Sequence, residues 1–436
     1  MFTDASTAAG KAVLDDRYPA LHDLADAAHQ FAARHPNMCR VRTLGTSRGG
    51  RPLLLLTIGH ATEHVLVVSG AHADEFSGRA TVLELAHRIL AQPALHTVTW
   101  NFLLCLDPDG AFIAEDSRHA RTLKQYFATF YRPAAEEQPE WAPAIGADLP
   151  ESRILLDLID ELRPRLQFSL HSTDIGGTFV QATCHLPGLA EPFAKSAAAL
   201  GIPVDSGSFD TFWLQEPGPG VFTMNAGEID RQESTTGMLT ASTGDEDPAA
   251  GVQATSWFVP QRHGGDTLII EVPVWASRPN SQGAADPRIH LATCSDHLRD
   301  RARQITTLFD TVRPHLADTP LLRAAHTPLT AMSQLADQWD PNGDGKRLLQ
   351  SGLMTPARLE GIELWAHRLP IRTAALLRRA LTPDNADSAQ PLDILLHDWC
   401  ARYEKRFEPT WIPVAHQSVH QANTVLAAME ARMHVA

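Results

Sequence analysis

The residues with the clearest chemical potential are a histidine and a glutamate three positions apart. His72 and Glu75 follow the apolar run that begins at Val65, and a helix-like pattern from Thr81 to Leu90 comes next. The run predicts a buried strand, so an imidazole and a carboxylate stand at its C-terminal tip. A catalytic zinc site takes three protein ligands and keeps one open position, and this pair could supply two of the three.

A second strand-like run supplies a candidate third ligand. Residues Leu166 to Leu170 are mostly apolar, and His171 follows them directly. Functional groups gather at the carboxyl ends of strands in open α/β sheets, which favours a common site for this histidine and the first pair. The alternative is a histidine that only caps or hydrogen-bonds the strand end.

A carboxylate inside a third apolar run is a candidate general base. Glu271 lies within Leu268-Ile-Ile-Glu-Val-Pro-Val. An ionised carboxylate among apolar residues is costly unless it is paired or used, and burial can tune its pKa toward the working range of a base. The alternative is a glutamate on the solvent face of an edge strand.

The elements that must position these residues alternate between strand and helix over the first 290 residues, which predicts an α/β domain with a mostly parallel sheet. Strand patterns end beyond about residue 290, where helical patterns predict an all-α unit. We therefore expect two domains, 1–290 and 291–436, the second of unknown role. The predicted strands cover 41–43 and 53–58 (a hairpin), 65–69, 98–106, 166–170 and 267–275, and the predicted helices cover 18–35, 81–90, 153–162, 298–312, 359–369, 373–380 and 422–433.

Composition excludes several classes of function. The 436 residues suffice for a large core and a smaller domain. A net charge of −14 without a basic cluster argues against nucleic-acid binding, and no apolar run is long enough to span a bilayer. The N-terminus has no signal-peptide pattern, and five scattered cysteines without a Cys-x-x-Cys pair indicate reduced thiols. We expect a cytoplasmic protein.

Several segments together resemble the zinc carboxypeptidases, the M14 family of metallocarboxypeptidases, over roughly residues 17–280. Their order along the chain matches the order of the family's motifs. The matching segments are Gly45-Thr-Ser-Arg-Gly-Gly-Arg-Pro, Gly70-Ala-His-Ala-Asp-Glu-Phe, Asp107-Pro-Asp-Gly, Ser117-Arg-His-Ala-Arg, Ser169-Leu-His-Ser and Thr267-Leu-Ile-Ile-Glu.

The resemblance implies a carboxypeptidase-like α/β/α sandwich with a mixed, mostly parallel sheet, followed here by the all-α domain. It implies one zinc ion per chain, held by His72, Glu75 and His171. Zinc would lower the pKa of a bound water and polarise the scissile carbonyl. Glu271 would take the water's proton and pass it to the leaving amine, and Arg121 would meet the developing oxyanion.

Two departures from the family concern the substrate. The family clamps a terminal carboxylate with an Asn-Arg pair, and the nearest candidates here are Tyr131 and Arg132, with tyrosine in place of asparagine. The family's flexible tyrosine has no counterpart, and Trp257 or His263 could occupy that space. Hydrolytic chemistry is therefore better supported than classical C-terminal peptide specificity.

We expect a zinc-dependent hydrolase that cleaves an amide bond in a small peptide or an N-acyl amino acid by the promoted-water route. A metal-dependent deacylase or esterase of a small metabolite is the runner-up. A non-catalytic binding module that retains the fold and a purely structural zinc site are further alternatives. We expect no nucleic-acid or membrane partner, and association into a homo-oligomer through the C-terminal helices stays open.

Overall fold

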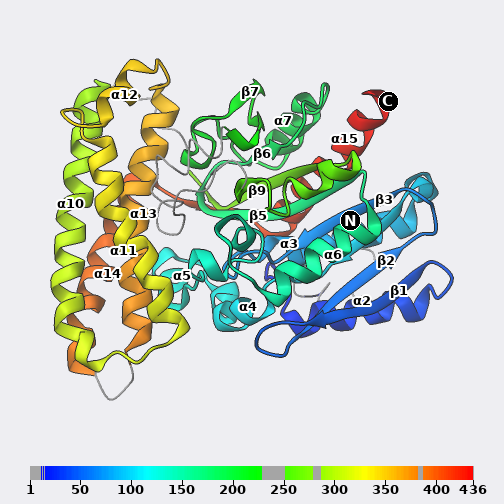
Figure 1. Cartoon of the computed structure of the whole chain (residues 1–436), viewed down its shortest axis with the longest axis horizontal. Coiled ribbons are helices and arrows are strands. Elements are labelled where there is room, and N and C mark those ends of the chain that lie inside the picture. The colour runs from blue at the N-terminus through cyan, green and yellow to red at the C-terminus, as the bar shows by residue number, and fades with distance from the viewer. Residues whose placement is uncertain are drawn as a thin grey trace.

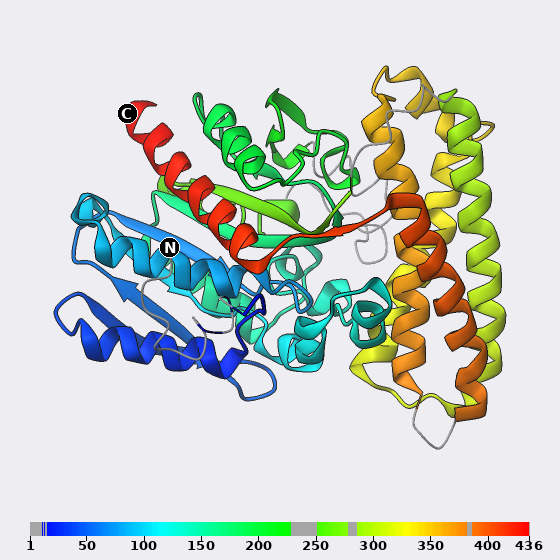
Figure 2. The ribbon, with the colours of Figure 1, turned by 180° about the vertical axis from the view of Figure 1, so that it is seen from behind.

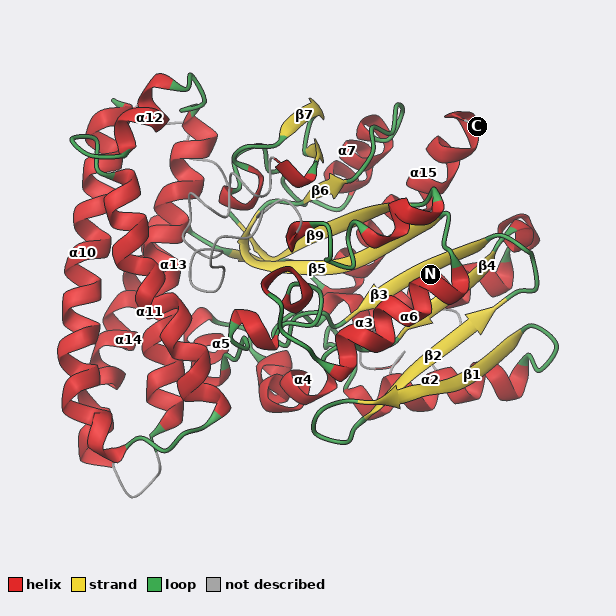
Figure 3. Cartoon of the chain, viewed as in Figure 1, coloured by secondary structure: helices red, strands yellow, loops and turns green. Residues whose placement is uncertain are grey.

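A mixed sheet forms the centre of the molecule (Figures 1 and 3). The computed structural model describes residues 11, 13, 15–227, 251–277, 286–381 and 386–435, and within them the sheet has ten strands. The strand order is β1-β2-β4-β3-β5-β9-β6-β8-β7, with β10 paired to β9. The strands are β1 (Cys39–Thr46), β2 (Pro52–Ile58), β3 (His64–Ser69), β4 (Thr99–Leu103), β5 (Leu166–Gly176), β6 (Phe179–Ala182), β7 (Gln215–Gly218), β8 (Val221–Thr223), β9 (Asp266–Ala276) and β10 (Thr410–Trp411).

Strand direction differs between the centre and the flanks of the sheet. The central strands β4, β3, β5 and β9 run parallel to one another. β1 and β2 form the predicted antiparallel hairpin, and β2 and β6 join the centre as antiparallel neighbours of β4 and β9. The α/β fold and the mixed sheet are confirmed, although the parallel character is concentrated in the central strands.

Helices cover both faces of this sheet because successive residues of a strand point to opposite sides. In β3, Val65 and Val67 pack toward α2, α3 and α15, whereas Leu66 and Val68 pack toward α6 on the other face. Figure 2 shows α2, α3 and α15 lying side by side across the back of the sheet. These covering helices are α2 (Leu21–Arg34), α3 (Ser77–Ala91), α6 (Pro150–Leu162), α7 (Ala190–Ala199) and α15 (Val414–Val435).

A separate layer of long helices stands at one end of the sheet, on the left in Figure 1. Its helices pack mainly on each other. The sequence predicted 359–369 and 373–380 as two helices, but they form one helix, α13, which continues through Pro370. The layer contains α10 (Pro287–Val312), α11 (Pro320–Trp339), α12 (Gly345–Gln350), α13 (Pro356–Ala380) and α14 (Ala386–Phe407).

The end of the chain leaves this helical layer and returns to the sheet. β10 pairs with β9, and α15 packs against α3 and α7. Residues 410–435 therefore lie with the α/β part, although the sequence assigned them to the helical domain 291–436. The division into two domains at residue 290 stays a prediction. Among the helices that the structure describes, none has the length and apolar character needed to cross a bilayer.

Candidate metal centre

The pairing of two parallel strands brings a candidate ligand next to the candidate base. His171 of β5 and Glu271 of β9 are direct partners in the register of these strands. The strand β5 does not end at His171, as predicted, but continues with β9 as far as Gly176. His171 consequently lies within the sheet, where strand pairing fixes its backbone.

The turn after β3 delivers the other two candidate ligands. Gly70 adopts a φ of +65°, and a Cβ atom there would come within 2.7 Å of Cys105 Sγ. A side chain at this position would be strained by both its conformation and its surroundings. The glycine allows a tight exit from β3, and His72 and Glu75 follow before α3 begins at Ser77.

The three predicted ligands converge on one point. Glu75 Oε1 lies 2.9 Å from His72 Nδ1, and Glu75 Oε2 lies 2.9 Å from His171 Nδ1. The two Nδ1 atoms are 3.2 Å apart. Ligands at zinc-like bond lengths in a tetrahedron are separated by roughly 3.3 Å, which is close to these distances. The His-Glu-His donor set therefore fits a metal ion such as zinc.

Glu140, a buried glutamate that the sequence did not single out, contacts the Nε2 side of His171. Glu140 Oε2 lies 3.0 Å from His171 Nε2, and the side chain also accepts hydrogen bonds from Ser169 Oγ at 2.7 Å and Trp257 Nε1 at 2.9 Å. A carboxylate in this position keeps a proton on Nε2, which leaves the lone pair of Nδ1 for a metal. Glu140 thus orients a ligand without being one.

Burial and neighbouring charges together shift the pKa values of Glu75 and Glu271 in opposite directions. Burial favours the neutral form of Glu75, but His72 and Arg132 outweigh it and hold its pKa well below the usual range. Burial, together with the charge of Glu75, raises the pKa of Glu271 to about 8. Glu271 lies 4.0 Å from His171 Nδ1, and its Oε2 is buried without a hydrogen-bond partner among the described residues. Its position beside the cluster and its open acceptor oxygen suit a general base.

The predicted substrate residue Arg132 reaches the cluster, but two carboxylates already bind its guanidinium. Nε donates to Asp74 Oδ1 at 2.8 Å, and a terminal nitrogen pairs with Glu75. Tyr126 adds a hydrogen bond to Asp74 at 2.8 Å. Arg132 consequently supports the ionised state and the position of a ligand.

The structure corrects two predicted site residues. Arg121 lies away from the cluster, because its guanidinium stacks 4.3 Å from the centre of the Trp411 ring and bonds to the carbonyl of Asp16. Tyr131 is 1% exposed and belongs to the hydrophobic core rather than to the cavity beside Arg132. The proposed oxyanion and carboxylate contacts of these two side chains therefore have no geometric basis.

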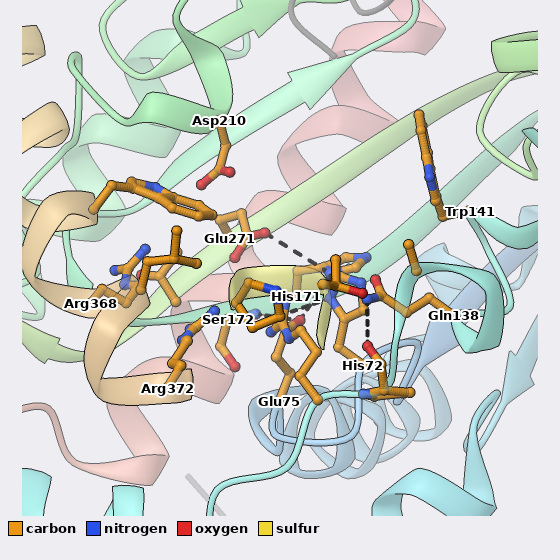
Figure 4. A pocket seen from close by; sticks show the side chains of 18 of the residues that line it. His72, Glu75, Gln138, Trp141, His171, Ser172, Asp210, Glu271, Arg368 and Arg372 are labelled. Carbon is orange, nitrogen blue, oxygen red and sulfur yellow. Dashed lines mark hydrogen bonds and ion pairs between the residues drawn. The ribbon is translucent and has the colours of Figure 1, made fainter. Parts of the chain in front are cut away.

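The cluster opens into a cavity of about 270 Å³, which is lined by residues of the α/β part and of the helical layer (Figure 4). The sheet supplies His171 and Glu271, the turn after β3 supplies His72 and Glu75, and Trp257 joins them from the segment before β9. His263 is outside the lining and pairs with Asp160 instead. The helical layer closes the opposite side with residues of α11 and α13: Ala324, Thr327, Pro328, Ala331, Trp365, Arg368, Leu369, Arg372 and Leu376.

Two arginines of α13 in this wall were also missed by the sequence analysis. Arg368 pairs with Asp174 Oδ1 at 2.5 Å, and Arg372 approaches Asp174 Oδ2 at 3.3 Å. Asp174 belongs to β5, three residues after His171, so one strand holds both a candidate ligand and the anchor of the helical wall. Basic residues on a long helix usually face solvent, and no local motif distinguished these two.

Comparison with known proteins confirms the family resemblance over part of the chain. Residues 24–172 match the family described as zinc carboxypeptidase. A search of curated proteins found no match. Among solved structures, a metallo-carboxypeptidase from Burkholderia cenocepacia is similar, at 19% identity and a TM-score of 0.33, over 57% of this chain and 58% of that chain. The chain thus spans little more than half the length of that relative. Carboxypeptidase A from Helicoverpa armigera matches at 15% identity and a TM-score of 0.35, over 62% of this chain and 68% of that one.

Proposed function

Because residues 24–172 match the zinc carboxypeptidase family, we propose that this protein is a zinc-dependent hydrolase that cleaves an amide bond in a small peptide or an N-acyl amino acid. The observation that carries the proposal is the convergence of His72, Glu75 and His171 beside Glu271, whose Oε2 has no hydrogen-bond partner among the described residues. A zinc ion held there would supply Lewis-acid chemistry, polarising a carbonyl and lowering the pKa of a water molecule.

The protein's own residues have distinct tasks in this reaction. Glu271 accepts the proton of the attacking water at its free carboxylate oxygen and passes it to the leaving nitrogen, so that the amine departs neutral. Glu140 keeps His171 in one tautomer, and Arg132 keeps Glu75 ionised. The walls contributed by α11 and α13 restrict the space around the scissile bond to small molecules.

A second candidate is a deacylase or esterase that acts on a small metabolite. The small cavity favours this candidate because it suits a small substrate. The guanidinium of Arg132 favours it too, because Asp74 and Glu75 already occupy donors that could hold the free C-terminus of a peptide. Both candidates share the ligands, the base and the attacking water. They differ in whether the substrate must carry a free carboxylate, and an esterase differs also in its leaving group. Hydrolysis of matched amide and ester substrates, each with and without a free carboxylate, separates them.

The test of the proposed function combines metal content with turnover. Wild-type protein is expected to bind about one zinc per chain and to hydrolyse members of a panel of dipeptides, N-acyl amino acids and their esters. Glu271→Gln should keep zinc and lose roughly 10²–10⁴-fold in rate, because only the base is removed. His72→Ala should lose zinc and activity together.

A matched control is His60→Ala, since His60 also precedes a glutamate by three positions but is exposed and bonded to the carbonyl of Asn37. It should change neither zinc content nor rate. Wild-type protein that takes up no zinc from a stoichiometric solution would overturn the proposal, and unchanged turnover in Glu271→Gln would overturn the assignment of the base.

A further inference from the structure

The cavity has two chemically different ends, with the candidate metal cluster between them. Figure 4 shows Arg368 and Arg372 of α13 on one side of His72 and His171, and Trp141 on the other. All of these residues line the same cavity. A ligand that spans the cluster therefore meets cationic groups at one end and an indole at the other.

The arginines in the cavity differ in how far their donors are already used. Arg132 is engaged by two carboxylates, Asp74 and Glu75. Arg368 is 4% exposed, forms a 2.5 Å ion pair with Asp174 and donates to the carbonyl of Ile175. Arg368 Nε also lacks a hydrogen-bond partner among the described residues, but the 2.5 Å ion pair and its deeper burial hold this guanidinium against Asp174, so neither arginine is well suited to hold a substrate anion.

Arg372 is the arginine with donors to spare. Its closest described carboxylate oxygen belongs to Asp174, 3.3 Å away, and this carboxylate is already bound at 2.5 Å by Arg368. Its Nε is buried without a hydrogen-bond partner among the described residues. The guanidinium lies 5.0 Å from the centre of the Phe130 ring, and both residues line the cavity. Buried donors of this kind favour an anionic ligand with two acceptor oxygens.

Two arginines and two aspartates set the charge around this position. Two arginines share the single carboxylate of Asp174, whose pKa lies below its usual range despite burial because Arg368 and Arg372 stabilise the ionised form. Asp210, in the short helical turn Phe209–Thr211, also lines the cavity and stabilises the charge of Arg368. The two aspartates balance the two arginines in charge, so the buried Nε of Arg372, which has no hydrogen-bond partner among the described residues, is what favours an acceptor ligand here.

The opposite end of the cavity is mainly apolar, although Gln138 also lines it. Trp141 and Trp257 pack with their ring centres 5.8 Å apart, and Met224 and Ile269 belong to the same hydrophobic cluster. All four residues line the cavity. This end suits an aromatic or branched acyl group, which aromatic and apolar side chains bind through buried area and ring contacts.

We propose that Arg372, anchored by Asp174 in the wall formed by α13, binds the carboxylate of a small amide substrate whose apolar acyl group lies toward Trp141. The inference rests on the proposed hydrolase function and narrows its substrate class to N-acyl amino acids and related acids with a bulky acyl group. It assigns recognition of the substrate anion to the helical layer, outside the segment that matches the family.

The test measures binding rather than hydrolysis, so that it stands apart from the question of turnover. The protein is the full chain, loaded with zinc and carrying Glu271→Gln to prevent cleavage. The probes are N-benzoylglycine and its neutral counterpart N-benzoylglycinamide, and dissociation constants are measured by calorimetry. The acid should bind more tightly than the amide. Arg372→Gln should weaken binding of the acid by roughly 10- to 100-fold and leave binding of the amide unchanged.

Arg378→Gln is the matched control, because Arg378 lies on the same helix in an exposed ion pair with Asp393 and outside the cavity. It should affect neither probe. Arg372→Lys keeps the charge but not the fork, so it should weaken binding of the acid by less than Arg372→Gln does and leave binding of the amide unchanged. If Arg372→Gln does not fold, this selective weakening of the acid in Arg372→Lys is the deciding result.

Three outcomes overturn the inference: equal binding of acid and amide by the parent protein, including no binding of either; equal losses for both probes in the Arg372 variants; or a selective loss of the acid in Arg132→Gln but not in the Arg372 variants. A chain that binds the acid through Arg372 yet hydrolyses no amide or ester would instead contradict the proposed function alone.

Discussion

Glu140 offers the sharpest test of how this site holds a metal. Its carboxylate lies 3.0 Å from His171 Nε2 and is fixed by Ser169 and Trp257 at 2.7 and 2.9 Å, in a position that is 2% exposed. In Glu140→Gln the side chain keeps its shape, but the amide offers only one acceptor oxygen for these three groups. The amide oxygen can still accept from His171 Nε2 and Trp257 Nε1 if the NH₂ group faces the Ser169 hydroxyl, but this neutral acceptor holds the proton on Nε2 less strongly than the carboxylate does.

The expected consequence is a loss of zinc affinity. Removal of a carboxylate behind a histidine ligand typically costs 10- to 100-fold in metal affinity, which corresponds to about 1.4–2.7 kcal/mol. A hydrogen bond to a charged group contributes about 1.5–3 kcal/mol, so two independent estimates agree. The assay is competition for zinc with a chromophoric chelator at pH 7.5, accompanied by a thermal unfolding curve to verify the fold.

Glu136→Gln is the control, because Glu136 lies in the same loop but is exposed. It should bind zinc as tightly as the wild type. The reasoning is refuted if Glu140→Gln is folded and its zinc affinity stays within twofold of the wild-type value. Trp257→Phe removes only one of the three hydrogen bonds and should give a smaller loss than Glu140→Gln.

Further predictions concern stability. Asp174→Asn should lower the free energy of unfolding by roughly 3–5 kcal/mol in urea denaturation, because it leaves the buried Arg368 without its carboxylate; a change below 1 kcal/mol would contradict a structural ion pair. Burial lowers the pKa of His297 to about 3 and of His367 to about 4, so the folded protein keeps both neutral while the unfolded chain takes up protons below about pH 6.5. Stability should therefore fall between pH 7.5 and 5 by up to about 2 kcal/mol per imidazole, and the double variant to Gln should flatten this slope. Gly70→Ala should destabilise the turn before the ligands by about 1–3 kcal/mol and weaken zinc binding. Chelation of zinc should lower the midpoint of thermal unfolding, and added zinc should restore it.

Strand alternation explains why part of the site could be predicted from the sequence. The apolar runs before His72 and around Glu271 identified β3 and β9, and the run before His171 identified the start of β5. Neighbouring parallel strands then place paired residues side by side, as the pairing of His171 with Glu271 shows. Local patterns sufficed for these residues because regular strands carry them.

Residues carried by loops and by distant elements escaped prediction for the opposite reason. Glu140 lies between the short helical turns Ala135–Glu137 and Ala142–Ile145, where no hydrophobic period shows which way a side chain points. Arg372 reaches the cavity only because α13 packs across the end of the sheet. Arg121 was assigned through motif resemblance alone, and the path of the chain between α4 (Pro108–Ala114) and α5 (Leu123–Thr129) carries it to Trp411 instead.

The return of the chain to the sheet makes the helical layer an insertion with two points of attachment. The layer leaves after β9 and rejoins at β10, which pairs with that same strand, and Figure 2 shows α15 continuing across the back of the sheet. A truncation near residue 290 would remove α15 and uncover apolar residues of β5 and β9 that are otherwise fully buried. An isolated α/β core would instead require internal excision of the layer and a linker joining β9 to β10. Because both attachments lie on one strand pair, the layer cannot swing freely on a single tether, and its cavity wall is set in place together with the sheet.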